Sequence, residues 1–182
     1  MFFIRLDADP LKCYFMAEGK MMHMMDETGL TGKQKITLLS MWGLLKQDLH
    51  VHGRNVLLTM FNQHPEFLSY FDFSADLNST NLADNEALFS HSLNMINGFG
   101  ALIEYGLNSP KMFQCSLTKL AKNHKWRMVS GVDVRLFGNV MLNYFIEVLD
   151  RQAANDLPNA FGRFMDIIAD AFDDYPSPRA SS

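Results

Sequence analysis

Apolar residues recur along most of this chain at spacings of three and four, which is the period of an α-helix. The pattern begins after Thr31, whose side chain suits the N-cap of a helix. The apolar positions that follow at helical spacing are Ile36, Leu39, Trp42 and Leu45. We therefore expect regular structure to start at residue 31 and a first helix to bury these side chains.

A second helix is expected after a break near residues 48–50, with Leu57, Met60 and Phe61 on one side. Gly53 lies inside it, where glycine costs about 1 kcal/mol relative to alanine. Close passage of another helix would explain a glycine there. The pair His64-Pro65 then predicts a new, short helix, because proline suits the first helical turn.

Two further predicted helices each place a histidine on an apolar stripe. In residues 84–105 the expected buried positions are Leu88, His91, Met95, Phe99 and Leu102. Ser109-Pro110 opens the next helix, where the stripe is Phe113, Leu117, Leu120 and His124. An imidazole in such a stripe either is buried and bonded to a carbonyl or holds a metal through its other nitrogen. The pattern alone leaves both interpretations open.

Two long helices are expected to complete the chain. Ser130 and Asp133 have the spacing of a capping box and predict a helix to about residue 151. The last helix should begin near residues 156–158 and bury Phe161, Phe164, Met165, Ile168 and Phe172. No segment has the alternation of a strand. The prediction is an all-α fold of seven or eight helices, two of them very short.

Composition narrows the class of protein. The formal charge of −4 gives no electrostatic reason to expect nucleic acid or an anionic membrane as a partner. Cys13 and Cys115 are the only cysteines, which argues against a disulfide scaffold and is typical of a reducing cytosol. No stretch approaches the ~18 uninterrupted apolar residues of a membrane span, and none near the N-terminus has secretory length. We expect a soluble, cytoplasmic protein.

Periodicity also divides the chain into an N-terminal extension (1–30), one helical domain (31–174) and a C-terminal tail (175–182). The extension contains the run KMMHMM at residues 20–25, whose soft side chains could bind Cu(I), but methionine is also a flexible apolar filler. His50 and His52 are two residues apart and point to different helix faces, so they make a poor metal pair. The sequence contains no C-x-x-C-H, Walker, H-E-x-x-H or G-x-S-x-G motif that would indicate other chemistry.

In their order and distances, six residues together resemble the globin family: Trp42, Gly53, Pro65, Phe71, His91 and His124. The similarity covers about residues 30–174, and the segment NHKWRMVSGVDV around His124 looks closest to invertebrate, particularly molluscan, intracellular globins. The resemblance implies a globin fold of about seven to eight helices around non-covalently bound haem b (iron protoporphyrin IX).

Carried over residue by residue, the resemblance implies that His124 is the proximal ligand of the haem iron, with its other N–H bonded to the carbonyl of Leu120. Phe71 would lie flat on the porphyrin. His91 would face the iron from the distal side. The other residues implied to line the pocket are Leu57, Met95, Leu120, Val129, Val134 and Phe137. Lys125 or Arg127 could reach the haem propionates.

The sequence departs from the family pattern at several places. Met95 is bulkier than the aliphatic residue usual there, and Ser92 stands where glycine is commonest, at the crossing opposite Gly53. The interval from His91 to His124 is longer than in vertebrate oxygen carriers, and residues 1–30 have no counterpart in a minimal globin.

The function that the resemblance implies is reversible binding of O2, for transport or storage, with CO and NO as further ligands. Two alternatives stay open. One is a gas or redox sensor in which His91 is the sixth ligand of the iron. The other is an enzyme, a nitric oxide dioxygenase or nitrite reductase, which would need a reductant. A non-enzymatic carrier is favoured because the chain has no room for a reductase domain, and association into a homo-dimer or other oligomer is left open.

Overall fold

The computed structural model describes residues 22–72, 82–149 and 155–175. Over these ranges the chain is helical, and its only strand-like feature is an isolated antiparallel bridge between Met25 and Thr31, which confirms the all-α prediction. The α-helices are α2 (Gly32–Leu45), α3 (Leu49–Gln63), α4 (Glu86–Glu104), α5 (Pro110–His124), α6 (Gly131–Val148) and α7 (Leu157–Asp174). The 3-10 turns between them are η1 (Lys46–Asp48), η2 (Pro65–Tyr70), η4 (Leu82–Asp84), η5 (Gly106–Asn108) and η6 (Lys125–Arg127).

Side-chain caps set the starts of two helices, as their sequences predict. The Thr31 hydroxyl accepts the N–H of Gln34 at 3.2 Å, and the Gln34 side chain accepts the N–H of Thr31 at 2.9 Å. Ser130 and Asp133 form the same reciprocal box at the start of α6. Both pairs satisfy backbone N–H groups that have no partner inside the helix. The predicted starts of α2 and α6 are therefore confirmed.

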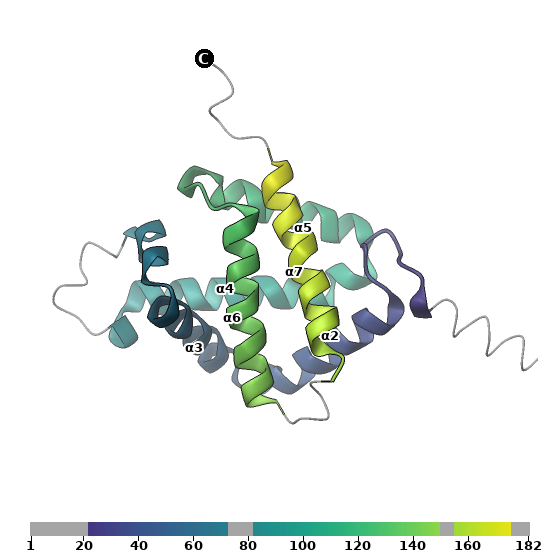
Figure 1. Ribbon diagram of the computed structural model, residues 1–182, viewed down its shortest axis with the longest axis horizontal. Coiled ribbons are helices and arrows are strands. Elements are labelled where there is room, and N and C mark those ends of the chain that lie inside the picture. The colour runs from purple at the N-terminus through teal and green to yellow at the C-terminus, as the bar shows by residue number, and fades with distance from the viewer. Residues whose placement is uncertain (1–21, 73–81, 150–154, 176–182) are drawn as a thin grey trace, which may run out of the picture.

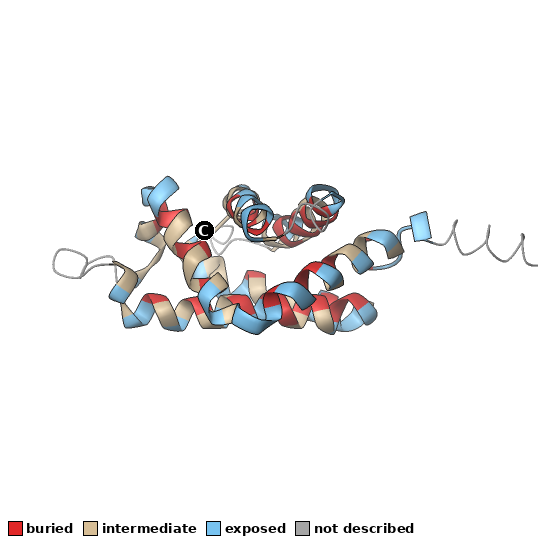
Figure 2. Cartoon of the chain, turned by 90° about the horizontal axis from the view of Figure 1, so that it is seen from below, coloured by how far each residue is buried: buried red, intermediate tan, exposed pale blue. Residues whose placement is uncertain are grey.

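The helices lie in two layers. α6 and α7 run side by side and cross α4 steeply (Figure 1). In the view from below they stand over the layer of α2 and α4, and many of the buried residues lie on the sides where the layers face each other (Figure 2). The main core includes four phenylalanines that are at most 2% exposed, Phe113, Phe145, Phe161 and Phe164. Aromatic rings from α5, α6 and α7 thus contact one another within the main core.

A second, smaller apolar cluster lies where α3, η2, α4 and α6 meet. Its buried members are Leu57, Met60, Phe61, Phe67, Leu88 and Val140. Met95 and Phe137 pack against both this cluster and the main core. They therefore mark the boundary between the two.

The predicted buried face of the first helix is wrong in one respect, because Ile36 is 55% exposed. The side chains that α2 buries are Leu38, Met41, Trp42 and Leu45. A residue turns about 100° around an α-helix, so positions 36 and 45 lie about half a turn apart and cannot share a face. The steps of three, one and three in the observed set keep to one side of the helix.

α3 and α4 cross at Gly53, as the glycine in the second predicted helix suggests. A Cβ atom at Gly53 would lie 2.9 Å from the carbonyl oxygen of Ser92 and 3.0 Å from Cβ of Ile96, too close for any side chain. Ser92 is fully buried, and its hydroxyl donates to the carbonyl of Phe89 at 2.7 Å. Serine is therefore small enough for the crossing and leaves no unsatisfied hydroxyl.

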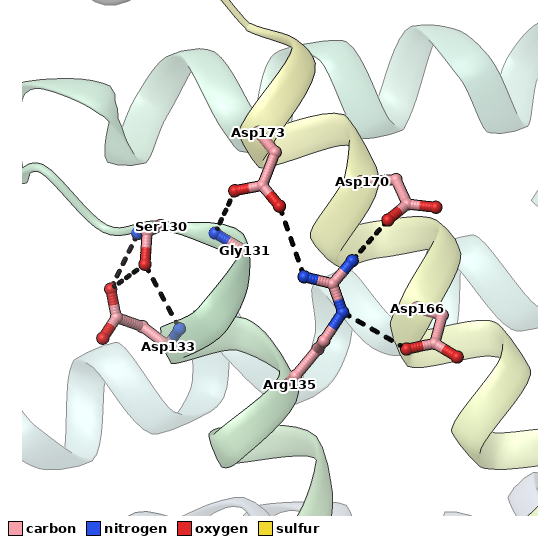
Figure 3. Close-up of polar contacts among 7 residues, drawn as sticks. All are labelled: Ser130, Gly131, Asp133, Arg135, Asp166, Asp170 and Asp173. Atoms are coloured by element: carbon pink, nitrogen blue, oxygen red, sulfur yellow. Dashed lines mark hydrogen bonds and ion pairs between the residues drawn. The ribbon is translucent and has the colours of Figure 1, made fainter.

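One arginine joins α6 to α7. Arg135 pairs with Asp166, Asp170 and Asp173, which project from successive turns of α7 (Figure 3). Asp173 also accepts the backbone N–H of Gly131 at 2.8 Å. Because Gly131 is the first residue of α6, this contact ties the start of α6 to the end of α7.

The described part of the predicted N-terminal extension packs on the helices. Leu30 is fully buried in the main core, and the carbonyl of Gly29 accepts a hydrogen bond from Arg163 of α7 at 3.2 Å. Gly29 has φ +77°, a left-handed conformation that favours glycine. The boundary between residues 30 and 31 stays a prediction, and so does that at residue 175.

Several predictions fall on residues outside the described ranges, including Cys13, the first two residues of the KMMHMM run and the end of the tail. In that run, Met22, Met24 and Met25 are described and exposed. Among the described residues, no group of three His, Cys, Asp or Glu side chains could hold a metal ion. Within the same ranges, no helix combines the length and the apolar character that crossing a membrane requires.

Candidate functional site

His124 is the last residue of α5, and its imidazole is oriented by the helix that carries it. Nδ1 lies 2.9 Å from the carbonyl oxygen of Leu120, one turn back, which confirms the expected hydrogen bond. A carbonyl oxygen can only accept, so Nδ1 carries the hydrogen. In the neutral ring, Nε2 is then the nitrogen with a lone pair for a metal.

The ring of His124 also contacts α7. Phe172 lies with its centroid 5.5 Å from that of His124, and the two planes are tilted by 44°. Phe172 is half-buried at the edge of the main core, as its position in the predicted stripe of α7 suggests. The imidazole is therefore held by a backbone hydrogen bond on one side and by an aromatic ring on another.

His91 projects from α4 against Phe71. The two ring centroids are 4.9 Å apart with planes at 86°, an edge-to-face arrangement. Phe71 makes a similar contact with Phe61, at 5.1 Å and 89°. These three rings form a continuous aromatic row that begins in the second cluster and ends at His91.

Burial lowers the pKa of His91, and the positive charges of His124 and Arg127 lower that pKa further. The imidazole is consequently neutral at pH 7, with one N–H donor and one lone pair. A neutral His91 can either donate a hydrogen bond to a ligand or bind a metal.

The other residues that the sequence predicts for the site belong to one of the two apolar clusters or pack against them. Leu57 is buried in the second cluster and Val134 in the main core, while Met95 and Phe137 contact both. Leu120 and Val129 are half-buried at the edge of the main core. Their role toward a cofactor stays a prediction.

The two cations expected near the haem propionates both have protein partners. Lys125 Nζ lies 4.7 Å from the ring centroid of Tyr175. Arg127 donates to the backbone carbonyl of Tyr70 and to the carboxylate of Asp72. Sequence reasoning missed Asp72, since nothing in the local pattern links it to a residue 55 positions away.

The donors in this region suit an iron porphyrin better than a bare metal ion. A lone imidazole with an oriented lone pair can provide one axial ligand, and the neighbouring aromatic and aliphatic side chains can pack on a flat apolar ring. No buried side-chain N or O atom lacks a hydrogen-bond partner in the described part of the chain.

Comparison with known proteins finds matches to the part of the chain that contains these residues. Residues 54–172 match the family model described as Globin. The chain is 26% identical to "Myoglobin" of Cyprinus carpio over 138 residues, which cover 76% of this chain and 90% of that protein. It is 32% identical to "Globin-2B" of Anadara trapezia over 111 residues, which cover 61% of this chain and 72% of that protein. The matched region includes Phe71, His91 and His124.

Proposed function

The chain belongs to the globin family, and on that premise we propose that it binds one haem b non-covalently and binds O2 reversibly for transport or storage. Haem would supply the ferrous iron at which a diatomic gas binds. The observation that best supports this proposal is the hydrogen bond from Nδ1 of His124 to the carbonyl of Leu120, because it puts the hydrogen on Nδ1 and leaves the lone pair on Nε2 for a metal.

In this proposal His124 is the proximal ligand. The hydrogen bond at Nδ1 orients the ring and raises the basicity of Nε2, which strengthens its bond to the metal. The contact with Phe172 limits rotation of the ring. Leu120 and Val129 would cover the haem on the same side.

His91 would act on the opposite side of the haem. As a neutral imidazole it can donate its N–H to a gas ligand that carries partial negative charge. A hydrogen bond to a charged acceptor contributes about 1.5–3 kcal/mol, or roughly ten- to hundredfold in affinity. The edge-to-face contact with Phe71 favours this role over iron ligation, because it holds the ring against the aromatic row.

The remaining residues would shape an apolar pocket. Phe71 would lie against the porphyrin, and Leu57, Met95, Val134 and Phe137 would complete the wall. Apolar walls exclude water and anions, which protects ferrous iron from oxidation. CO and NO, which are also small diatomic gases, would bind in the same place. We propose no turnover for this chain, since nitric oxide dioxygenation or nitrite reduction would need an external reductant.

The test begins with reconstitution of the purified chain with haem. We expect one haem per chain and its loss or severe weakening in His124→Ala. His50→Ala is the matched control, because His50 is exposed and should keep full haem. A His124→Ala protein with full haem and an unchanged ferrous spectrum would overturn the assignment.

The spectrum of the deoxy-ferrous protein separates the carrier from the six-coordinate sensor. A single broad visible band indicates five-coordinate iron with an open site, as we propose. Two sharp visible bands indicate that a second ligand is bound, and their loss in His91→Leu would identify that ligand as His91.

A further inference from the structure

Arg127 holds the chain on both sides of Phe71. It lies in η6, three residues after His124, and reaches across to a segment 55 residues earlier. Its guanidinium donates to the backbone carbonyl of Tyr70 and, through two nitrogens, to the carboxylate of Asp72, at 3.1 and 2.5 Å. Residues 70 and 72 are the immediate neighbours of Phe71.

The chemistry of these contacts requires arginine. A planar guanidinium can make two parallel hydrogen bonds to a carboxylate and a third to a carbonyl, whereas an ammonium group acts as a single point of charge. The ring of Trp126 stacks on the guanidinium, with its centroid 3.9 Å from Cζ, which restricts the side chain further. Arg127 is consequently fixed in orientation and in partners.

The energetics indicate a local role. The side chain of Asp72 is 82% exposed, and exposed ion pairs contribute little to global stability. The two anchored residues nevertheless flank a ring that packs on both Phe61 and His91. Small movements of this backbone would move the Phe71 ring, so the contacts should affect the position of that ring more than the free energy of unfolding.

We infer that Arg127 is a positioning residue, which sets Phe71 relative to His124 and uses its donors on Tyr70 and Asp72 in place of the haem propionates. The inference rests on the proposed haem site. It links the segment that follows the proximal histidine directly to the phenylalanine that would lie on the porphyrin. Loss of the link should therefore loosen the haem without unfolding the protein.

The test measures transfer of haem from the ferric protein to an excess of an apo-globin acceptor. We expect Asp72→Ala and Arg127→Ala each to speed haem loss roughly three- to tenfold, the effect of a weak ion pair with added hydrogen bonds. The double variant should be no faster than the faster single variant, because the two residues act through one contact. Arg127→Lys should behave like Arg127→Ala, because the contacts depend on the planar geometry of the guanidinium more than on its positive charge.

Other outcomes would overturn the inference. Faster loss in Arg127→Ala, with normal rates in Asp72→Ala and Arg127→Lys, would mean that Arg127 attracts the propionates by charge. Normal rates in all variants would remove any role for Arg127. Lys46→Ala is the matched control, because it breaks a cross-helix pair with Glu104 outside the site and should leave the rate unchanged.

A spectroscopic readout separates positioning from a general loss of stability. In the ferric cyanide-bound protein, the hyperfine shifts of the Phe71 ring protons depend on their position relative to the iron. We expect these shifts to change in Asp72→Ala and to stay constant in Lys46→Ala. Unchanged shifts in Asp72→Ala would contradict the inference. Failure of the unmodified chain to bind haem would instead contradict the proposed function, before any variant is compared.

Discussion

The Nδ1 atom of His124 lies 2.9 Å from the carbonyl oxygen of Leu120, so one turn of α5 determines which nitrogen of the ring carries hydrogen. We expect the haem-free protein, at a pH where this ring is neutral, to show the Nδ1–H tautomer of His124 in nitrogen-detected NMR. The exposed His50 provides the comparison within the same sample. A dominant Nε2–H tautomer at His124 would contradict the proposed orientation of its lone pair.

Gly53 should be intolerant of any side chain. Gly53→Ala places a Cβ 2.9 Å from the carbonyl oxygen of Ser92, and the overpacking should cost about 1–3 kcal/mol in the free energy of unfolding. Gly98→Ala is the matched control, since a Cβ there meets nothing within 4 Å. In that exposed helical position, alanine should stabilise by about 0.5–1 kcal/mol. Urea unfolding of both variants measures the difference. Equal changes in the free energy of unfolding would contradict the close crossing of α3 and α4 at Gly53.

Stability should fall as the pH drops below about 6.5, the ordinary pKa of histidine. Burial lowers the pKa of His52, whose Nδ1 lies 2.9 Å from the hydroxyl of Tyr144, and the charge of His50 lowers it further, while Asp48 opposes this shift. The folded state then binds fewer protons than the unfolded state, so the stability present above pH 6.5 is lost as the pH falls through the lowered pKa.

His52→Gln should show a flatter dependence of unfolding free energy on pH between 7 and 5 than the unmodified haem-free chain. His91 contributes in the same direction, because its pKa is also lowered, so part of the slope should persist. A steeper slope in His52→Gln would contradict the direction of the shift.

Arg135 should stabilise the protein by neutralising three carboxylates on α7. Arg135→Gln leaves Asp166, Asp170 and Asp173 close together on α7 without their cation, so their mutual repulsion should lower the melting temperature. Added salt should narrow the difference from the unmodified protein, because salt screens exposed charges. A salt-independent loss would indicate that the packing of the Arg135 stem, and not its charge, is responsible.

Met95 should restrict entry of the gas. Its side chain packs against both apolar clusters beside the proposed distal side. Met95→Val removes bulk there, so the rate of CO association after flash photolysis should rise several-fold. Leu58→Val, on α3 at the edge of the second cluster, is a suitable control and should leave the rate unchanged.

Much of the fold could be predicted because the relevant signals are local. The caps at Thr31 and Ser130 involve residues three apart, and Pro65 and Pro110 mark helix starts through their own ring geometry. The bond from His124 to Leu120 is also local, since it spans one helical turn. Such features depend on few residues and leave a direct trace in the sequence.

The features that could not be predicted depend on contacts across the fold. Asp72 and Arg127 are 55 residues apart, and neither belongs to a motif that names the other. The exposure of Ile36 depends on which side of α2 faces α4 and α7, which the spacing of apolar residues leaves ambiguous. Tertiary packing determines both the contact between Asp72 and Arg127 and the exposure of Ile36.

The crossing at Gly53 has a consequence for gas affinity. Leu57 lies one turn after Gly53 on α3, and His91 directly precedes Ser92 on α4, so the distance between the helices at the crossing also governs the distance between these two side chains. In the proposed function, spreading the helices would move His91 relative to a bound gas without altering any residue that touches the gas. For the O2 carrier that we propose, we therefore expect affinity to be adjustable from position 53, outside the proposed pocket.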